Sequence, residues 1–167
     1  MHIQRSMILI CFNLFFLLVI VEGYAAQAES SFSGTWSANG TKEGLSFGKD
    51  REVALFKLAG LVHLQDSVGT QTDYWSECIG LGDTQNGSDI RCVWRSLDGQ
   101  QVYIVLQAKQ MAEGTLVTGE IVGGTGNLAG IKGTLGFQWS TLSFQGTGKL
   151  ESVGGYAKGL KGTYILP

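Results

Sequence analysis

The chain has 167 residues, enough for one domain, and its 12 basic and 14 acidic residues leave a net charge of −2. No basic patch with interleaved aromatic residues occurs, which argues against nucleic-acid binding. Glycine is abundant, with 25 residues, and the one proline is the last residue, Pro167. Short runs in which apolar and β-branched residues alternate predict an all-β domain with many turns rather than a helical protein.

The N-terminal segment has the features of an export signal. Arg5 supplies a positive charge, Met7 to Val21 form an apolar core, and Ala26-Gln27-Ala28 is a small-residue cleavage site. We therefore expect residues 1–28 to be a signal peptide and residues 29–167 to be a single secreted or periplasmic domain with no membrane attachment after cleavage. An uncleaved anchor is the alternative, although the apolar core is short for a spanning helix.

Two cysteines, Cys78 and Cys92, remain in the mature chain. Because an exported protein meets an oxidising compartment, these residues predict a disulfide. Zinc binding is the alternative, but two thiols with His63, the one mature histidine, make a poor zinc site. We expect no metal and no other cofactor.

Segments with strand-like alternation continue through the mature chain and amount to about eight strands. Asn39-Gly40 and Asp98-Gly99 are two-residue hairpin signals, and Ala59-Gly60 predicts a bulge or bend within a strand. The predicted strands are Ser31–Ala38, Glu52–Leu64, Thr72–Leu81, Ser88–Leu97, Gln100–Gln110, Thr115–Val122, Ile131–Leu142, Phe144–Leu150 and Tyr156–Leu166. Eight strands close a small barrel that has room for one ligand.

The run Ile121–Thr134, IVGGTGNLAGIKGT, places five glycines between two β-rich segments. It predicts a return loop with Leu128 and Ile131 as apolar anchors, and with positive φ at Gly124 or Gly126. A phosphate-binding loop is disfavoured, because the run lacks the GxxxxGK[ST] pattern and no helical pattern follows it.

This glycine loop resembles the corresponding loop of the allene oxide cyclase and dirigent-protein barrels. The resemblance implies a calycin-like, antiparallel barrel of about eight strands with an apolar cavity, frequently oligomeric. Within that group, the plant cyclases isomerise an unstable fatty-acid epoxide and the dirigent proteins steer radical coupling. Gly34-Thr35-Trp36 also looks like the G-x-W of lipocalins and avidins, although no late arginine accompanies it here.

A disulfide would set the register of the middle strands. If Cys78 and Cys92 lie opposite each other, the turn between them centres on Gln85, within a segment of turn-forming residues, and Trp75 lies opposite Arg95. A two-residue turn at Asp98-Gly99 would then place Trp94 opposite Tyr103 and Arg95 opposite Val102.

These two registers predict the composition of each sheet face. One face would carry Tyr74, Ser76, the disulfide, Trp94, Tyr103 and Val105, and the other Asp73, Trp75, Glu77, Arg91, Arg95, Val102, Ile104 and Leu106. Because charged groups usually face water, we expect the second face outside, with Val102, Ile104 and Leu106 as an exposed apolar patch. In the alternative orientation, Glu77 and its two diagonal arginines form a buried charged site.

Candidate site residues follow from these patterns, because no catalytic motif of a known kind occurs. Glu77 and His63 are the candidate acid–base residues, although His63 lies in an apolar run and favours a structural role. The candidate ligand-binding residues are Trp36, Tyr74, Trp75, Arg91, Trp94, Arg95 and Tyr103. We expect the four tryptophans, Trp36, Trp75, Trp94 and Trp139, in the core and cavity wall.

The sequence favours a non-enzymatic role in which the barrel binds a small apolar ligand. One alternative is a cyclase or isomerase that holds a reactive substrate in a folded conformation. The other is a structural or interaction protein whose barrel is filled by its own side chains. A homo-oligomer is a further expectation, from the resemblance.

Overall fold

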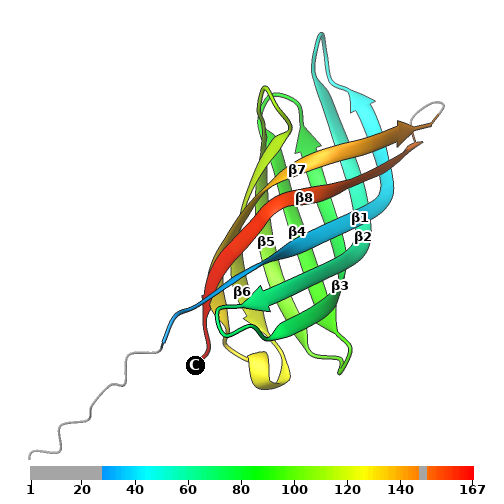
Figure 1. The fold of residues 1–167 in the computed structure, drawn as a ribbon. Coiled ribbons are helices and arrows are strands. Elements are labelled where there is room, and N and C mark those ends of the chain that lie inside the picture. Colours follow the sequence, from blue (N-terminus) through cyan, green and yellow to red (C-terminus); the bar gives the residue numbers. More distant parts are fainter. Residues whose placement is uncertain (1–27, 147–149) are drawn as a thin grey trace, which may run out of the picture.

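A computed structural model describes residues 28–146 and 150–167. Eight consecutive antiparallel strands form a closed barrel in which β8 pairs with β1 (Figure 1). The strands are β1 (Ser30–Ser46), β2 (Glu52–Asp66), β3 (Gln71–Asp83), β4 (Gly87–Ser96), β5 (Gln101–Gln110), β6 (Thr115–Gly124), β7 (Lys132–Gln145) and β8 (Leu150–Ile165). The predicted eight-stranded antiparallel barrel is confirmed.

Alternation along each strand decides which side chains enter the barrel. On β3, Ser76 and Cys78 are buried, whereas the neighbouring Trp75, Glu77 and Ile79 are exposed. This period of two follows from the pleat, which points successive side chains to opposite faces. The buried core is made of Phe32, Trp36, Ala38, Val62, Cys78, Ile90, Cys92, Trp94, Val102, Ile104, Leu106, Val117, Ile121, Ile131, Leu135, Phe137, Ala157 and Leu160.

The glycine loop covers one end of the barrel. It contains the short helical turn η1 (Gly126–Leu128), which lies near the C-terminal end of the chain in Figure 1. Gly126 has a φ of 59°, as predicted for one of the two glycines. Ile131 is buried and Leu128 packs against the core, so the two predicted anchors attach the loop to this end.

Strand β1 is longer than predicted. Asn39 and Gly40 do not form a turn, since they pair with Ala59 and Leu58 of β2 and β1 continues to Ser46. Of the predicted bulge or bend at Ala59-Gly60, the bulge is absent, because the registers of β2 with both neighbours are continuous there. A Cβ at Gly60 would lie 1.9 Å from the Ser37 carbonyl oxygen, so this glycine serves a close approach of β1.

The end of the chain forms two long strands where the sequence suggested three shorter ones. The predicted strand Phe144–Leu150 is divided between the end of β7 and the start of β8. The pairing of β7 with β8 contains two register shifts, one between positions 136 and 138 and the other between positions 141 and 143.

The disulfide register is confirmed. Cys78 and Cys92 are bonded to each other and lie opposite on β3 and β4, where Trp75 pairs with Arg95 as predicted. The turn between them occupies the predicted segment, and Asp83 lies opposite Gly87.

The predicted register of β4 with β5 is wrong by one residue. Trp94 lies opposite Val102 rather than Tyr103. The loop has three residues instead of two: the Gly99 N–H donates to the Ser96 carbonyl at 3.0 Å and Gly99 has a φ of 84°. A Gly in this conformation after a tight turn is typical of three-residue hairpin loops.

A shift of one residue moves every side chain of β5 to the other face. Val102, Ile104 and Leu106 are therefore buried inside the barrel, and the expected exposed patch of these three residues does not form. Tyr103 instead lies outside, where 36% of its surface is exposed.

Candidate functional site

The barrel contains a cavity of about 390 Å³ at the end opposite the glycine loop. Side chains that point inward from β1, β2, β4, β5, β6, β7 and β8 form its apolar wall. They are Trp36, Ala54, Phe56, Leu58, Ile90, Leu106, Ala108, Val117, Phe137, Trp139 and Val153. The mouth is lined by polar residues, which are Lys42, Glu52, Asp83, Thr84, Ser88, Gln110, Thr115 and Thr141.

Trp36 lies between this cavity and the other half of the barrel. We call this other half the packed half, because side chains such as Trp94 and Tyr74 fill it. Its ring contacts Trp139 and Phe137, with centroid separations of 5.2 and 5.4 Å, and it also approaches Trp94 at 6.3 Å. Trp94 is 1% exposed and packs against Tyr74 on the far side. The aromatic cluster thus forms the floor of the cavity and fills the barrel below it.

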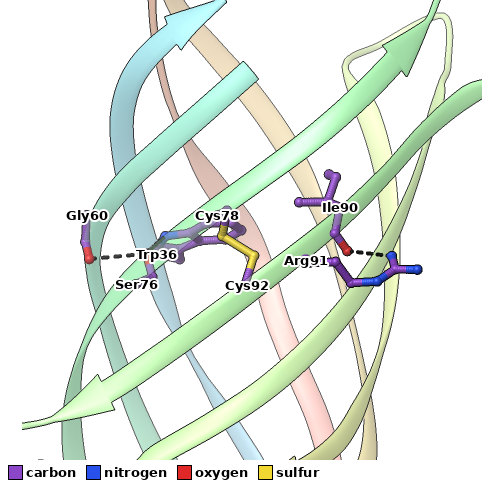
Figure 2. Close-up of a disulfide and its surroundings, with 7 residues drawn as sticks. All are labelled: Trp36, Gly60, Ser76, Cys78, Ile90, Arg91 and Cys92. Atoms are coloured by element: carbon purple, nitrogen blue, oxygen red, sulfur yellow. Dashed lines mark hydrogen bonds between the residues drawn. A yellow bond between two sulfur atoms is a disulfide. The ribbon is translucent and has the colours of Figure 1, made fainter. Parts of the chain in front are cut away.

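The polar edge of the Trp36 indole is satisfied within the wall. Its Nε1 donates to the Ser76 hydroxyl at 2.8 Å, and that hydroxyl donates to the Gly60 carbonyl at 3.2 Å (Figure 2). Because buried polar groups need partners, this chain fixes the orientation of the ring. Trp36 therefore presents an apolar surface to the cavity.

Glycines on neighbouring strands leave room for the aromatic wall. A Cβ at Gly80 would lie 2.4 Å from Cζ of Phe56, and one at Gly155 would lie 2.7 Å from the Trp139 ring. Both rings therefore lie close against the backbone of an adjacent strand, where a larger residue would push them into the barrel. This packing keeps the centre of the open half free of side chains.

Ion pairs surround the mouth. Lys42 Nζ lies 2.5 Å from Glu52 Oε1 and 3.8 Å from Glu151 Oε2. Arg51 binds Asp83 through two nitrogens, with Nε–Oδ1 and Nη2–Oδ2 distances of 3.1 and 2.5 Å. This bidentate pair joins the residue before β2 to the last residue of β3.

The surroundings of Asp83 favour its ionised form. The Arg51 guanidinium, followed by the backbone N–H of Gln85 and the side chain of Asn86, holds the pKa of Asp83 well below its usual range. Hydrogen bonds to the carboxylate explain the direction, since they stabilise the charged state. Asp83 also raises the pKa of Arg51.

The disulfide fastens the wall next to this site. Cys78 and Cys92 are 5% and 3% exposed, and their bond joins β3 to β4 close to Trp36 (Figure 2). Ile90, the next inward residue of β4, belongs to the cavity wall. The crosslink therefore holds together two strands that support the floor and wall of the cavity.

The structure separates the predicted ligand-binding residues into three groups. Trp36 lines the cavity, and Tyr74 and Trp94 lie inside the packed half. The remaining residues have side chains on the outside of the barrel, namely Trp75, Arg91, Arg95 and Tyr103. The expectation that Trp75 belongs to the core is wrong, because it is 46% exposed, whereas Trp139 lies in the cavity wall as expected.

Both candidate acid–base residues lie on the outer surface. Glu77 forms an ion pair with Arg95, with an Oε2–Nη1 distance of 3.4 Å, and both side chains are about half exposed. His63 Nδ1 contacts Asp73 Oδ1 at 2.7 Å, also on the outside. Arg91 points away from the barrel interior and donates to the Ile90 carbonyl (Figure 2). The predicted charged face is therefore exterior, and none of these groups reaches the cavity.

Sequence reasoning missed most of the cavity wall. The run Phe137-Gln138-Trp139 contains an inward-facing signal, since polar Gln138 separates its two aromatic residues. The inward residues of Ala54–Leu58 have no such signal, because Leu55 between them is apolar although it is exposed. Glu52 and Asp83, at strand ends next to turns, gave no such signal. Which residues meet at the open end depends on how all eight strands are staggered relative to one another along the barrel axis.

Within the two described ranges, no group of three or more histidine, cysteine, aspartate or glutamate side chains is placed to hold a metal ion. The same two ranges also contain no helix that is long and apolar enough to cross a membrane.

No family model matches the chain, and no curated protein matches it significantly. Among solved structures, the barrel is similar to a pterocarpan synthase dirigent protein, with a TM-score of 0.40 and 12% sequence identity. The alignment covers 81% of this chain and 90% of that chain. At this identity and TM-score, the likeness does not show that this chain belongs to the dirigent family or that it has the synthase activity of the neighbour.

Proposed function

We propose that this protein binds a small apolar molecule in the open half of its barrel. The observation that carries this proposal is the cavity itself, which has a volume of about 390 Å³ and an apolar wall that includes four aromatic side chains. Ligand sites in proteins have volumes in this range and combine apolar walls with a few polar groups. The packed aromatic cluster below Trp36 leaves one end of the barrel for entry.

The state of the ionisable groups supports binding rather than acid–base catalysis. Lys42, Glu52 and Asp83 line the mouth, and each takes part in an ion pair. Glu77 and His63 lie on the outer surface. The walls that would surround the body of a ligand are apolar, which suits retention of a molecule better than proton transfer to or from it.

We also propose that the protein is exported, to the periplasm or outside the cell. The disulfide supports this localisation, since such bonds persist in oxidising compartments. The signal-peptide features fall almost wholly outside the described residues. The intact mass of protein recovered from the periplasm or medium tests cleavage after Ala28, and retention of the full-length mass would contradict it.

The binding proposal is tested with N-phenylnaphthylamine, a neutral fluorophore that brightens in apolar sites. We compare Ala108→Phe, which fills the cavity from β5, with Gln107→Phe, which adds the same ring on the exposed face of that strand. The wild type and Gln107→Phe should enhance the fluorescence to the same degree, and Ala108→Phe should lose most of the enhancement. Binding that survives Ala108→Phe, or no binding by the wild type, would overturn the proposal.

Native mass spectrometry of the freshly purified protein provides an independent measurement. A co-purifying ligand should appear as a mass shift in the wild type and in Gln107→Phe, and be absent from Ala108→Phe. Such a result identifies the natural ligand by its mass.

A further inference from the structure

Resting on the proposed binding function, we infer that the cavity selects an apolar molecule with a cationic head group over the same molecule with a carboxylate. The inference comes from the charges at the mouth. A ligand whose apolar body fills the cavity would have its head group next to these charges. It adds the charge of the head group to the description of the ligand, a property that the apolar wall alone does not define.

Carboxylates outnumber cations in the described ion-pair cluster at the mouth. Glu52, Glu151 and Asp83 face Lys42 and Arg51, which leaves one excess negative charge. A ligand head group in the mouth therefore meets a negative potential. Several of these side chains are shielded from solvent, with Asp83 15% and Lys42 25% exposed, so that water screens their charges less than on an open surface.

Both cations of this cluster are already bound to carboxylates. Arg51 uses two nitrogens on Asp83, and Lys42 lies between Glu52 and Glu151. An entering carboxylate would compete with Glu52 and Glu151 for Lys42, or displace Asp83 from Arg51, and in either place it would lie near groups of its own charge. Either arrangement disfavours an anionic head, because like charges repel and a displaced carboxylate loses its hydrogen bonds.

A cationic head would meet acceptors instead. An ionised carboxylate has several lone-pair positions and accepts more than one hydrogen bond, so Glu52 is able to hold Lys42 and a ligand amine together. The wall also contains the aromatic rings of Phe56 and Trp139, and a cation that lies over an aromatic face is attracted to it. Acidic mouth and aromatic wall therefore favour the same kind of ligand.

The test compares three molecules with the same tail, octylammonium, octanol and octanoate, by isothermal titration calorimetry with the full mature protein. We expect octylammonium to bind about ten-fold more tightly than octanoate, the ratio that one interaction with a charged group supplies, and octanol to lie between them. The preference should weaken as salt is added, because the mouth remains in contact with solvent.

Variants connect the preference to the mouth. Glu52→Gln removes a lining carboxylate and should reduce the ratio toward one, whereas Asp89→Asn removes a carboxylate from the outer face of β4 and should leave the ratio unchanged. Glu151→Gln removes the other carboxylate that contacts Lys42 and provides a second test, should Glu52→Gln fail to fold.

The outcomes separate this inference from the proposed function. Equal or tighter binding of octanoate, displaced by N-phenylnaphthylamine, would overturn the charge selectivity and leave the cavity as a binding site. A Glu52→Gln ratio equal to the wild-type ratio would also overturn it. Absence of binding by all three molecules and by the fluorophore would overturn the proposed function and the inference together.

Discussion

The Trp36 indole N–H donates to the Ser76 hydroxyl at 2.8 Å, although the two residues are 40 positions apart in the sequence. Ser76 is completely buried, and its hydroxyl in turn donates a hydrogen bond to the Gly60 carbonyl. This bond connects β1 to β3 across β2. It also fixes the ring that forms the floor of the cavity.

Replacing Ser76 by alanine should therefore destabilise the barrel. The Trp36 N–H loses its partner while it stays buried, and such a loss typically costs about 1–3 kcal/mol. Urea unfolding of Ser76→Ala measures the change in the free energy of unfolding. The control is Ser37→Ala, at an exposed position of β1, and equal stabilities for the two variants would contradict the role given to this bond.

Loss of the disulfide should lower stability more strongly. The bond closes a loop between residues 14 positions apart, and a loop of this size restricts the unfolded chain by about 3 kcal/mol. The double variant Cys78→Ala with Cys92→Ala, compared with the reduced and oxidised wild type, tests this value. Two free thiols in protein purified from an oxidising compartment would show that the bond is not formed there.

Glu77→Ala should have a small effect. Its ion pair with Arg95 lies on the outer surface, where both side chains are about half exposed, and exposed pairs contribute at most about 1 kcal/mol. Chemical denaturation measures the change, with Arg95→Ala as the matched variant. A loss above about 3 kcal/mol is characteristic of a broken buried pair and would be incompatible with an exterior position.

Asp83 should contribute to acid sensitivity. Because Arg51 and two further donors lower its pKa in the folded state, the folded protein binds a proton there less readily than the unfolded chain. The resulting stabilisation is complete above the unfolded pKa of about 3.9 and is lost as the pH falls through the lower folded pKa. Asp83→Asn should be less stable than the wild type at neutral pH, and the difference should shrink below about pH 4.

The Asp83 prediction is measured by urea unfolding at a series of pH values. Asp89→Asn is the matched control, since it removes one negative charge from the outer face of the same end. A stability difference between Asp83→Asn and the wild type that is constant down to pH 2 would contradict the assignment, because it would show no linkage to this carboxyl.

Gly126→Ala should destabilise the glycine loop. Gly126 has a φ of 59°, and a residue with a Cβ is less stable in this left-handed region by about 1–2 kcal/mol. Gly123→Ala is the matched control, because a Cβ there meets nothing closer than an ordinary contact of 3.7 Å with Tyr103. Thermal or urea unfolding that ranks the two variants in the opposite order would refute this explanation.

Several features of the barrel are determined by the sequence itself, because separate local sequence patterns indicate the same structure. Strand alternation and the turn segments between the runs together predict about eight strands. The pairing of Cys78 with Cys92 agrees with the turn-forming residues between them, so that the covalent bond and the loop demand the same register. Positive φ in the glycine loop likewise follows from residue type.

Only the tertiary structure decides the sidedness of β5 and the position of the cavity. Asp98-Gly99 is compatible with loops of two or three residues, and this one-residue difference determines whether Val102 or Tyr103 faces the core. Which end of the barrel stays open depends on the position of each aromatic side chain along the barrel axis. Phe56, Trp139 and Trp36 come from three strands, and they meet because barrel closure pairs β8 with β1 and brings the end of the chain back to its beginning.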